Sequence, residues 1–178
     1  RIGYFARICP EKGLHQLVQA FKRIHTKYPH VSLRVGGYLG PRDFAYFEDV
    51  RSAAESLGQQ FEYIGSPTDH ATKVKFFKSL DIFSVPTEYQ EPKGISVLEA
   101  MANGVPVVQP AHGSFVEMIE HTKGGLLFEP GNIDDLVMKL EELIDDADLR
   151  FRLGRQGHAA VRESHSLEAM TSRSLAVF

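Results

Sequence analysis

Two segments of the chain carry side chains that could hold an anion. The first is the stretch ARICPEKG, in which Arg7 and Lys12 stand five positions apart directly after an apolar run. Arginine bonds two phosphate oxygens at once, lysine acts as a compact point charge, and the amides at the start of a following helix favour the same ligand. The two cations therefore suit a diphosphate. The alternative is a solvated loop in which Arg7 pairs with Glu11.

The second segment is PTEYQEPKGISVLEAMANGVPVV, in the middle of the chain. Gly94 permits close approach of the backbone, and the amides of Gly94, Ile95 and Ser96 are the expected unpaired donors at the start of a helix. Glu91 precedes this helix, and Glu99 lies a little over one turn into it. A carboxylate only accepts hydrogen bonds, so the vicinal diol of a sugar or ribose is a natural partner for either acid. Alternatively, both acids merely complement the helix dipole; this interpretation is weaker for Glu99, whose helix is largely apolar.

The residue types that commonly bind metals do not predict a metal site. Cys9 is the single cysteine, which excludes a thiolate cage and an internal disulfide. No two histidines stand four positions apart, and no acidic cluster accompanies them. We expect scattered surface side chains at the eight histidines, which are His15, His25, His30, His70, His112, His121, His158 and His165.

Short apolar runs alternate with helix-length segments along the chain. Six of these runs are strand candidates: residues 2–6, 31–35, 61–64, 82–85, 105–108 and 125–128. They are apolar throughout rather than at every second position, which is typical of parallel strands covered on both faces. The sequence therefore predicts an α/β domain, a doubly wound parallel sheet of about six strands with helices on both faces. In such a sheet a ligand lies beyond the carboxyl ends of the strands, where both anion-binding segments fall.

Helical periodicity supports this alternation. Apolar side chains recur at three- and four-residue spacing in two segments, first at Leu14, Leu17, Val18, Phe21 and Ile24 and later at Leu136, Val137, Leu140, Leu143 and Ile144. Capping boxes are predicted at two helix starts, one with Ser114 and Glu117 and one with Asn132 and Asp135. After Asp145 the strands stop. A polar helical tail from about residue 146 is predicted from the spacing of Leu149, Leu153, Val161 and Leu167.

Composition limits the class of protein. The 178 residues are 43% hydrophobic and 24% charged, which predicts one soluble globular domain. The formal net charge of −3 argues against a basic surface for nucleic acid or a membrane, and no apolar stretch approaches the roughly 18 residues of a membrane span. A single cysteine fits a reducing compartment, so we expect a cytoplasmic protein. The chain opens on an apolar run without an initiator Met, so we expect a piece of a longer protein.

The second segment resembles the E-x7-E segment of the large retaining glycosyltransferase family that contains sucrose synthases and bacterial mannosyltransferases. Other motifs occur in the family's order: the R-x-x-P-E-K-G opening, the pair Gly36-Gly37, and the stretch GGLLFEPG near the end. The resemblance extends from residue 1 to about residue 165. It implies that residues 1–178 are the carboxyl-terminal, donor-binding domain of a GT-B enzyme, one Rossmann-like half of that fold. The N-terminal acceptor domain would precede residue 1 and is absent from this chain.

The resemblance also implies roles for individual residues. Arg7 and Lys12 would hold the donor diphosphate and stabilise the charge that grows on the leaving nucleotide. Glu91 would contact sugar hydroxyls close to the reacting carbon, which makes these three the expected catalytic residues. The amides of Gly94, Ile95 and Ser96 would hold the diphosphate and sugar from the other side, and Glu99 would accept from the ribose hydroxyls. The residues expected to bind the donor are therefore Gly94, Ile95, Ser96 and Glu99.

The expected partners follow from the same resemblance. They are a nucleotide sugar and the acceptor domain in the same protein, with no nucleic acid, no membrane contact from this domain and no metal or other cofactor. The full-length protein could still lie peripherally at the inner face of a membrane. The nucleobase would lie near residues 65–70, and Phe61 and Tyr63 are expected as core strand residues rather than stacking platforms. The isolated chain is expected to bind nucleotide without transferring sugar.

Two positions depart from the family pattern. Lys93 replaces an aromatic residue before Gly94, and Ala111-His112-Gly113 replaces a glycine pair. Lys93 either favours an anionic or unusual donor or points to solvent, and His112 alters the expected contour of the sugar pocket. Two other functions stay open: a non-catalytic nucleotide-binding or regulatory module of the same fold, and half of a nucleotide-sugar epimerase.

Overall fold

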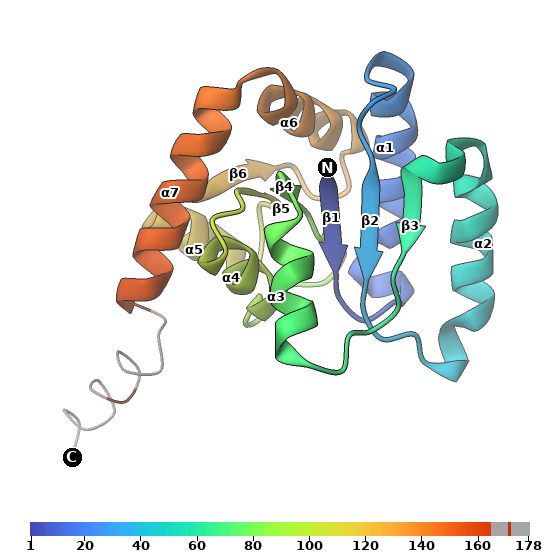
Figure 1. Ribbon diagram of the computed structural model, residues 1–178, viewed down its shortest axis with the longest axis horizontal. Helices are drawn as coiled ribbons and strands as arrows, with labels where there is room; N and C mark the ends of the chain where they lie inside the picture. The colour runs from blue at the N-terminus through green and yellow to red at the C-terminus, as the bar shows by residue number, and fades with distance from the viewer. Residues whose placement is uncertain (165–170, 172–178) are drawn as a thin grey trace.

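A computed structural model describes residues 1–164 and 171 of the chain (Figure 1). All strands that it describes form one parallel sheet in the order β3-β2-β1-β4-β5-β6. Their bounds are β1 Ile2–Phe5, β2 Leu33–Gly36, β3 Phe61–Tyr63, β4 Ile82–Phe83, β5 Val107–Pro110 and β6 Gly125–Phe128. The chain winds outward from β1 to β3 and then returns to β4 beside β1, so the order reverses between β1 and β4. The predicted doubly wound α/β fold is confirmed.

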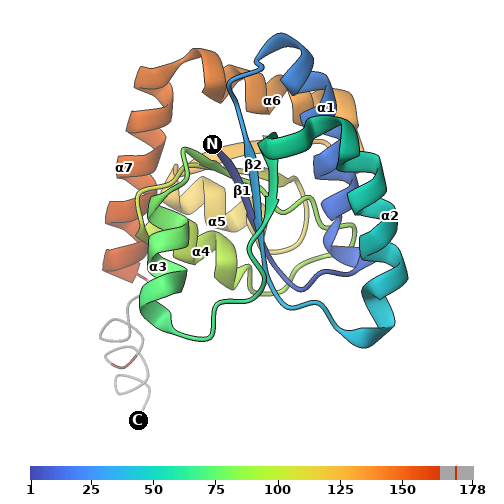
Figure 2. The ribbon, with the colours of Figure 1, turned by 45° about the vertical axis from the view of Figure 1, so that its right-hand side comes forward.

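Helices cover both faces of the sheet. Their bounds are α1 Leu14–Lys27, α2 Phe44–Ala54, α3 His70–Lys78, α4 Ile95–Ala102, α5 Phe115–Thr122, α6 Ile133–Asp145 and α7 Ala147–Ser164. Short 3-10 helices lie at Pro10–Lys12, Pro41–Asp43 and Glu55–Gln60. Helix α1 packs against α2 and α6 on one side, and α7 packs against α4 and α5 on the other, where α3 also lies (Figure 2).

The core lies between the sheet and these helices. The predicted apolar face of α1 is buried, and so is that of α6 except for Ile144, which packs against the core while partly exposed. Ile2 and Tyr4 of β1 have no exposed surface. Because helices cover both faces of the sheet, consecutive strand positions are apolar, as the sequence pattern indicated. Full burial of one leucine or isoleucine side chain in this core stabilises the folded state by about 1.5–3 kcal/mol.

The strand bounds differ from the predicted ones at several ends. The predicted strand 105–108 is wrong by two positions, because β5 runs from Val107 to Pro110. Pro106 has no N–H to donate and contributes its carbonyl to Phe83 N at 3.0 Å, so the strand begins after it. The buried Gln109 lies within β5, where its Oε1 accepts from Val85 N at 3.3 Å.

Neither predicted capping box forms in full, because the Asp135 side chain accepts from Glu129 N at 2.6 Å rather than from the Asn132 amide. Asn132 caps α6, since its side chain accepts from Asp135 N at 3.0 Å. Ser114 makes no such bond to α5, and its hydroxyl is buried without a partner among the described residues. The Ser114 amide donates to Glu91 O at 2.8 Å. Ser114 has helical torsion angles (φ −71°, ψ −11°), whereas a capping serine adopts an extended conformation.

The predicted tail is helical over Ala147–Ser164, where Leu153 and Val161 are buried. Leu167, also predicted to pack in this tail, lies outside the described residues. Among the described helices, none combines the length and apolar character needed to cross a membrane.

Candidate functional site

The carboxyl ends of β1 and β4 border a hollow of about 450 Å³ at the switch point of the sheet. All seven predicted site residues line it: Arg7, Lys12, Glu91, Gly94, Ile95, Ser96 and Glu99. The fold therefore brings together two segments that are nearly 80 positions apart in the chain.

A tight turn after β1 presents Lys12. Gly13 ends this turn with φ +69°, a left-handed conformation that favours glycine. A Cβ at Gly13 would lie only 1.8 Å from the carbonyl oxygen of Pro86, so no side chain fits there. The close approach fixes the turn against the loop that carries Glu91, and Lys12 is directed toward that loop.

Lys12, Tyr89 and Glu91 form one hydrogen-bonded cluster. Lys12 Nζ donates to Glu91 Oε2 and to Tyr89 Oη, each at 2.5 Å, and Tyr89 Oη donates to Glu91 Oε2 at 2.8 Å. Burial opposes the charge on Glu91, but the bonds from Lys12, Tyr89 and the Gly94 amide outweigh it and lower the pKa of Glu91 to about 2. Burial likewise opposes the charge on Lys12, yet the bonds to Glu91 and Tyr89 leave its pKa raised. Both groups are charged at neutral pH.

The loop that carries Glu91 is held by two of its own amides and by the Ser114 amide at the start of α5, which donates to Glu91 O. Glu91 Oε1 accepts from the amides of Lys93 and Gly94, each at 3.3 Å. The prediction that the Gly94 amide is unpaired is therefore wrong in this structure. The amides of Ile95 and Ser96 precede the first backbone bond of the helix, Val97 N to Gly94 O at 3.0 Å. These two amides are donors at the N-terminus of α4 that a ligand can use.

Glu99 has a partner that the sequence did not single out. Lys73 of α3 donates from Nζ to Glu99 Oε1 at 2.7 Å. The only sequence signal was indirect: an acid in an apolar helix needs a partner. The α3 segment offers Lys73, Lys75 and Lys78, and spacing alone does not tell which one faces α4. Glu99 is also less buried than its apolar helix suggested, with 34% of its side chain exposed.

Arg7 is the more exposed of the two cations predicted to hold the diphosphate. Its guanidinium Nε donates to Cys9 Sγ at 3.2 Å, and its Nη2 lies 4.0 Å from Glu11 Oε2. The hydrogen bond to Cys9 raises the pKa of Arg7. The solvated Arg7–Glu11 pair, the alternative from the sequence, is thus present as a long contact, with 59% of the Arg7 side chain exposed. Arg7 nevertheless lines the hollow beside Lys12.

The two departures from the family pattern have different surroundings. Lys93 is exposed and lines the hollow. His112 lies outside the set of lining residues, and its Nε2 is 3.0 Å from Thr87 O. His112 therefore ties the loop after β5 to the loop after β4. His158 is also partly exposed and makes a contact within the fold, with its Nδ1 2.7 Å from Ala102 O. His165 lies outside the described residues.

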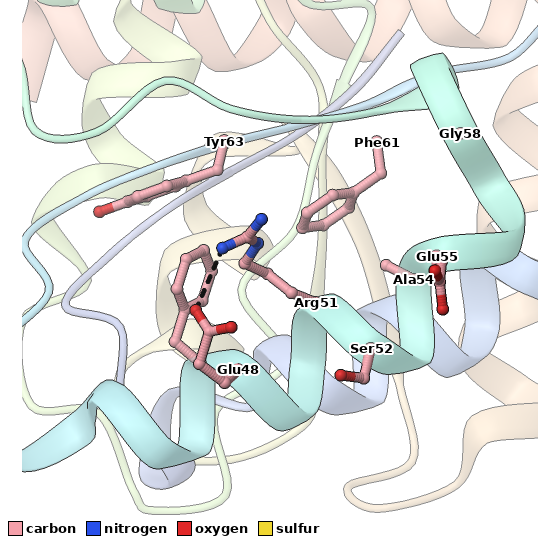
Figure 3. A pocket seen from close by; sticks show the side chains of 9 residues that line it. Glu48, Arg51, Ser52, Ala54, Glu55, Gly58, Phe61 and Tyr63 are labelled. Carbon is pink, nitrogen blue, oxygen red and sulfur yellow. Dashed lines mark hydrogen bonds and ion pairs between the residues drawn. The ribbon is translucent and has the colours of Figure 1, made fainter.

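A second hollow, of about 520 Å³, lies between α2 and β3 (Figure 3). Phe61 and Tyr63 line it, half-buried at the edge of the sheet, and Tyr63 packs on Phe47 with ring centroids 4.6 Å apart. Tyr63 Oη donates to Gly37 O at 2.9 Å. None of the seven predicted site residues lines this larger hollow. Tyr63 is thus tied to the strand framework, in line with its expected place in the strand.

Metal ligands do not gather in the described part of the chain, where no group of three His, Cys, Asp or Glu side chains is placed to hold an ion. The charged groups that face the hollow are instead the pairs Lys12–Glu91 and Lys73–Glu99, together with Arg7 and Lys93.

A doubly wound parallel sheet with cations, helix amides and carboxylates at its switch point is the arrangement of a Rossmann-like domain. The chain belongs to the family of glycosyl transferases group 1, whose family model matches residues 1–160.

Individual relatives agree with this assignment. The chain is 28% identical over 166 residues to the capsular polysaccharide biosynthesis glycosyltransferase CapM of Staphylococcus aureus, covering 93% of this chain and 42% of CapM. The C-terminal domain of the group 1 glycosyl transferase LpcC from Francisella tularensis is 28% identical, with a TM-score of 0.85, and the match covers 93% of this chain and 86% of that domain. Anabaena HepE, solved in complex with UDP, shares the fold at 22% identity and a TM-score of 0.85, over 99% of this chain and 48% of HepE. The chain thus spans less than half the length of CapM.

Proposed function

We propose that the chain is the donor-binding domain of a retaining glycosyltransferase, which moves a sugar from a nucleoside diphosphate sugar to an acceptor. The observation that carries the proposal is the convergence of all seven predicted residues on one hollow at the switch point. Membership of the glycosyl transferases group 1 family supports it, and so does the UDP bound to the similarly folded HepE.

Arg7 and Lys12 act on the diphosphate in this proposal. Negative charge grows on the nucleotide as its bond to the sugar breaks, and fixed cations next to that charge lower the barrier. The amides of Ile95 and Ser96 add donors from the N-terminus of α4. A hydrogen bond to a charged group contributes about 1.5–3 kcal/mol. Loss of Lys12 should therefore lower the rate of transfer roughly ten- to a few-hundredfold. We propose that these groups supply the positive charge without a metal ion.

The two carboxylates act on hydroxyl groups. Glu91, which is ionised at neutral pH, accepts hydrogen bonds from the donor sugar close to the reacting carbon. Glu99 accepts from the ribose diol. Binding of the diphosphate requires Lys12 to exchange its bond to Glu91 for bonds to phosphate, which leaves Glu91 able to take the sugar hydroxyls.

Transfer also needs a bound acceptor. CapM is more than twice as long as the segment that this chain matches. We therefore propose sugar transfer for a longer protein that contains this chain. We propose that an acceptor domain in the same protein closes the site, and that the 178-residue chain by itself binds donor without transferring sugar. A cytoplasmic location, expected from the single cysteine, belongs to the same proposal.

A thermal-shift panel tests the donor-binding role. UDP-, GDP- and ADP-sugars are added to the 178-residue chain, and a ligand that binds the folded state raises the melting temperature by mass action. We expect at least one of the three nucleotide classes to raise it in a concentration-dependent way. An unchanged melting temperature with all three at millimolar concentration would contradict the proposal.

A further inference from the structure

Lys73 lies between an aromatic ring and a carboxylate at the edge of the hollow. Its Nζ donates to Glu99 Oε1 at 2.7 Å and lies 4.9 Å from the centre of the Phe5 ring. Lys73, Phe5 and Glu99 all line the hollow, and 29% of the Lys73 side chain is exposed. Three different elements therefore meet at this ammonium group: β1, α3 and α4.

The surroundings hold Lys73 in place. The Phe5 ring packs on Phe76 and Phe77 of α3, with centroid distances of 5.4 and 5.6 Å. Asp69 caps α3 by accepting from Thr72 N at 2.8 Å, one residue before Lys73. A cation that is already packed on a fixed ring loses little further freedom when it bonds a carboxylate. The Lys73–Glu99 pair is therefore more ordered than an ordinary surface ion pair.

The pair leaves acceptor capacity on Glu99. A carboxylate offers about four lone-pair sites, and Lys73 uses one of them. The second oxygen, Oε2, is buried and accepts no hydrogen bond within the described part of the chain. Because Glu99 lines the hollow, hydroxyl donors of a ligand there can use the acceptor sites that Lys73 leaves free.

We infer that Lys73 is a positioning residue of the ribose site. This inference rests on the proposed donor-binding function. Lys73 holds the Glu99 carboxylate in the orientation that receives the ribose diol, and it acts on the ligand through Glu99 rather than through the phosphates. Its loss therefore weakens the recognition of ribose hydroxyls in particular.

The experiment compares ribose with deoxyribose ligands on matched variants. Dissociation constants are measured by calorimetry for UDP, GDP and ADP, and the tightest of the three is then compared with its 2′-deoxy and 3′-deoxy forms. Lys73→Met keeps most of the apolar stem and removes the charge, whereas Lys73→Arg keeps the charge. Lys78→Met is the control, since Lys78 is exposed on the same helix and lies outside the hollow. Melting temperatures without ligand show that each variant is folded.

The wild-type chain should prefer the ribose form over at least one deoxy form by about tenfold, the value of one hydrogen bond to a charged group. Lys73→Met should reduce that preference to less than threefold while binding the deoxy form as the wild type does. Lys73→Arg should retain part of the preference, and Lys78→Met should retain all of it.

Two results would overturn the inference. Equal weakening of ribose and deoxyribose ligands in Lys73→Met would mean that Lys73 acts on another part of the ligand. An unchanged preference in that variant would mean that Glu99 does not depend on Lys73. Failure of the wild-type chain to bind any of the three nucleotides would instead overturn the proposed function itself.

Discussion

Lys12 Nζ lies 2.5 Å from Glu91 Oε2, although the two residues are 79 positions apart in the chain. The pair joins the turn after β1 to the loop before α4, the two segments that carry the predicted site. Without ligand, the cation proposed to hold the phosphates is therefore paired with the carboxylate proposed to hold the sugar. In the proposed function, diphosphate binding would therefore require Lys12 to give up its bond to Glu91, because Lys12 cannot fully serve both.

Glu91→Gln should bind a nucleoside diphosphate more tightly than the wild type does, by about three- to tenfold. The substitution removes a carboxylate that competes for Lys12 and repels the phosphates. Calorimetry with UDP, GDP or ADP measures the change. Glu88→Gln is the matched control, since Glu88 is an exposed acid of the same loop that pairs with His15 instead. Weaker binding by Glu91→Gln would show that Glu91 does not compete for Lys12.

The Lys12–Glu91 pair should make the free energy of unfolding depend on pH in the acidic range. The pKa of Glu91 is lowered from 4.5 to about 2 in the folded chain, so its stabilising contribution is complete above pH 4.5 and is lost as the pH falls toward 2. The full contribution is on the order of 3 kcal/mol. The difference in urea midpoint between wild type and Glu91→Gln should therefore narrow from pH 7 to pH 3. A difference that stays constant over this range would contradict the lowered pKa.

Gly13→Ala should destabilise the fold more than Gly131→Ala does. Both glycines have positive φ, +69° and +76°, so both substitutions incur backbone strain of about 1–2 kcal/mol. A Cβ at Gly13 would also meet Pro86 O at 1.8 Å, whereas one at Gly131 meets nothing within 4 Å. We expect Gly13→Ala to cost at least about 2 kcal/mol more in urea unfolding. Equal costs would mean that the turn before α1 can move away from Pro86.

The two predicted helix caps should differ in energy. Asn132→Ala removes a bond to Asp135 N and should cost about 1 kcal/mol of the free energy of unfolding. Ser114→Ala removes a hydroxyl that has no partner in the described structure, and should change stability by less than about 0.5 kcal/mol. Denaturant unfolding of both variants compares them directly. A loss of 1 kcal/mol or more in Ser114→Ala would show that the Ser114 hydroxyl does cap α5, contrary to the structure.

The fold could be predicted because its pattern is local. Apolar runs without alternation, separated by amphipathic helical segments, leave few arrangements other than a covered parallel sheet. The meeting of Arg7, Lys12, Glu91 and Glu99 then followed from the rule that the carboxyl ends of parallel strands share one edge of the sheet.

The contacts around those residues could not be predicted from spacing. Lys73 reaches Glu99 only because α3 lies beside α4 in the folded chain, and Tyr89 joins Lys12 and Glu91 only through the path of its loop. The sequence pattern at Ser114 predicts a cap, but the Ser114 amide donates to Glu91 O and the residue adopts a helical conformation. Local rules failed where a contact between distant segments set the conformation.

Calorimetric titration of the wild type, Lys12→Ala and Lys22→Ala with UDP, GDP and ADP tests the central claim most directly. Lys22 is an exposed lysine on α1 outside the hollow, so its variant controls for the loss of one positive charge. The account predicts that at least one nucleotide binds the wild type and Lys22→Ala equally well, and binds Lys12→Ala about ten- to a few-hundredfold more weakly. Equal affinity of wild type and Lys12→Ala, or no binding of any of the three nucleotides to the wild type, would contradict it.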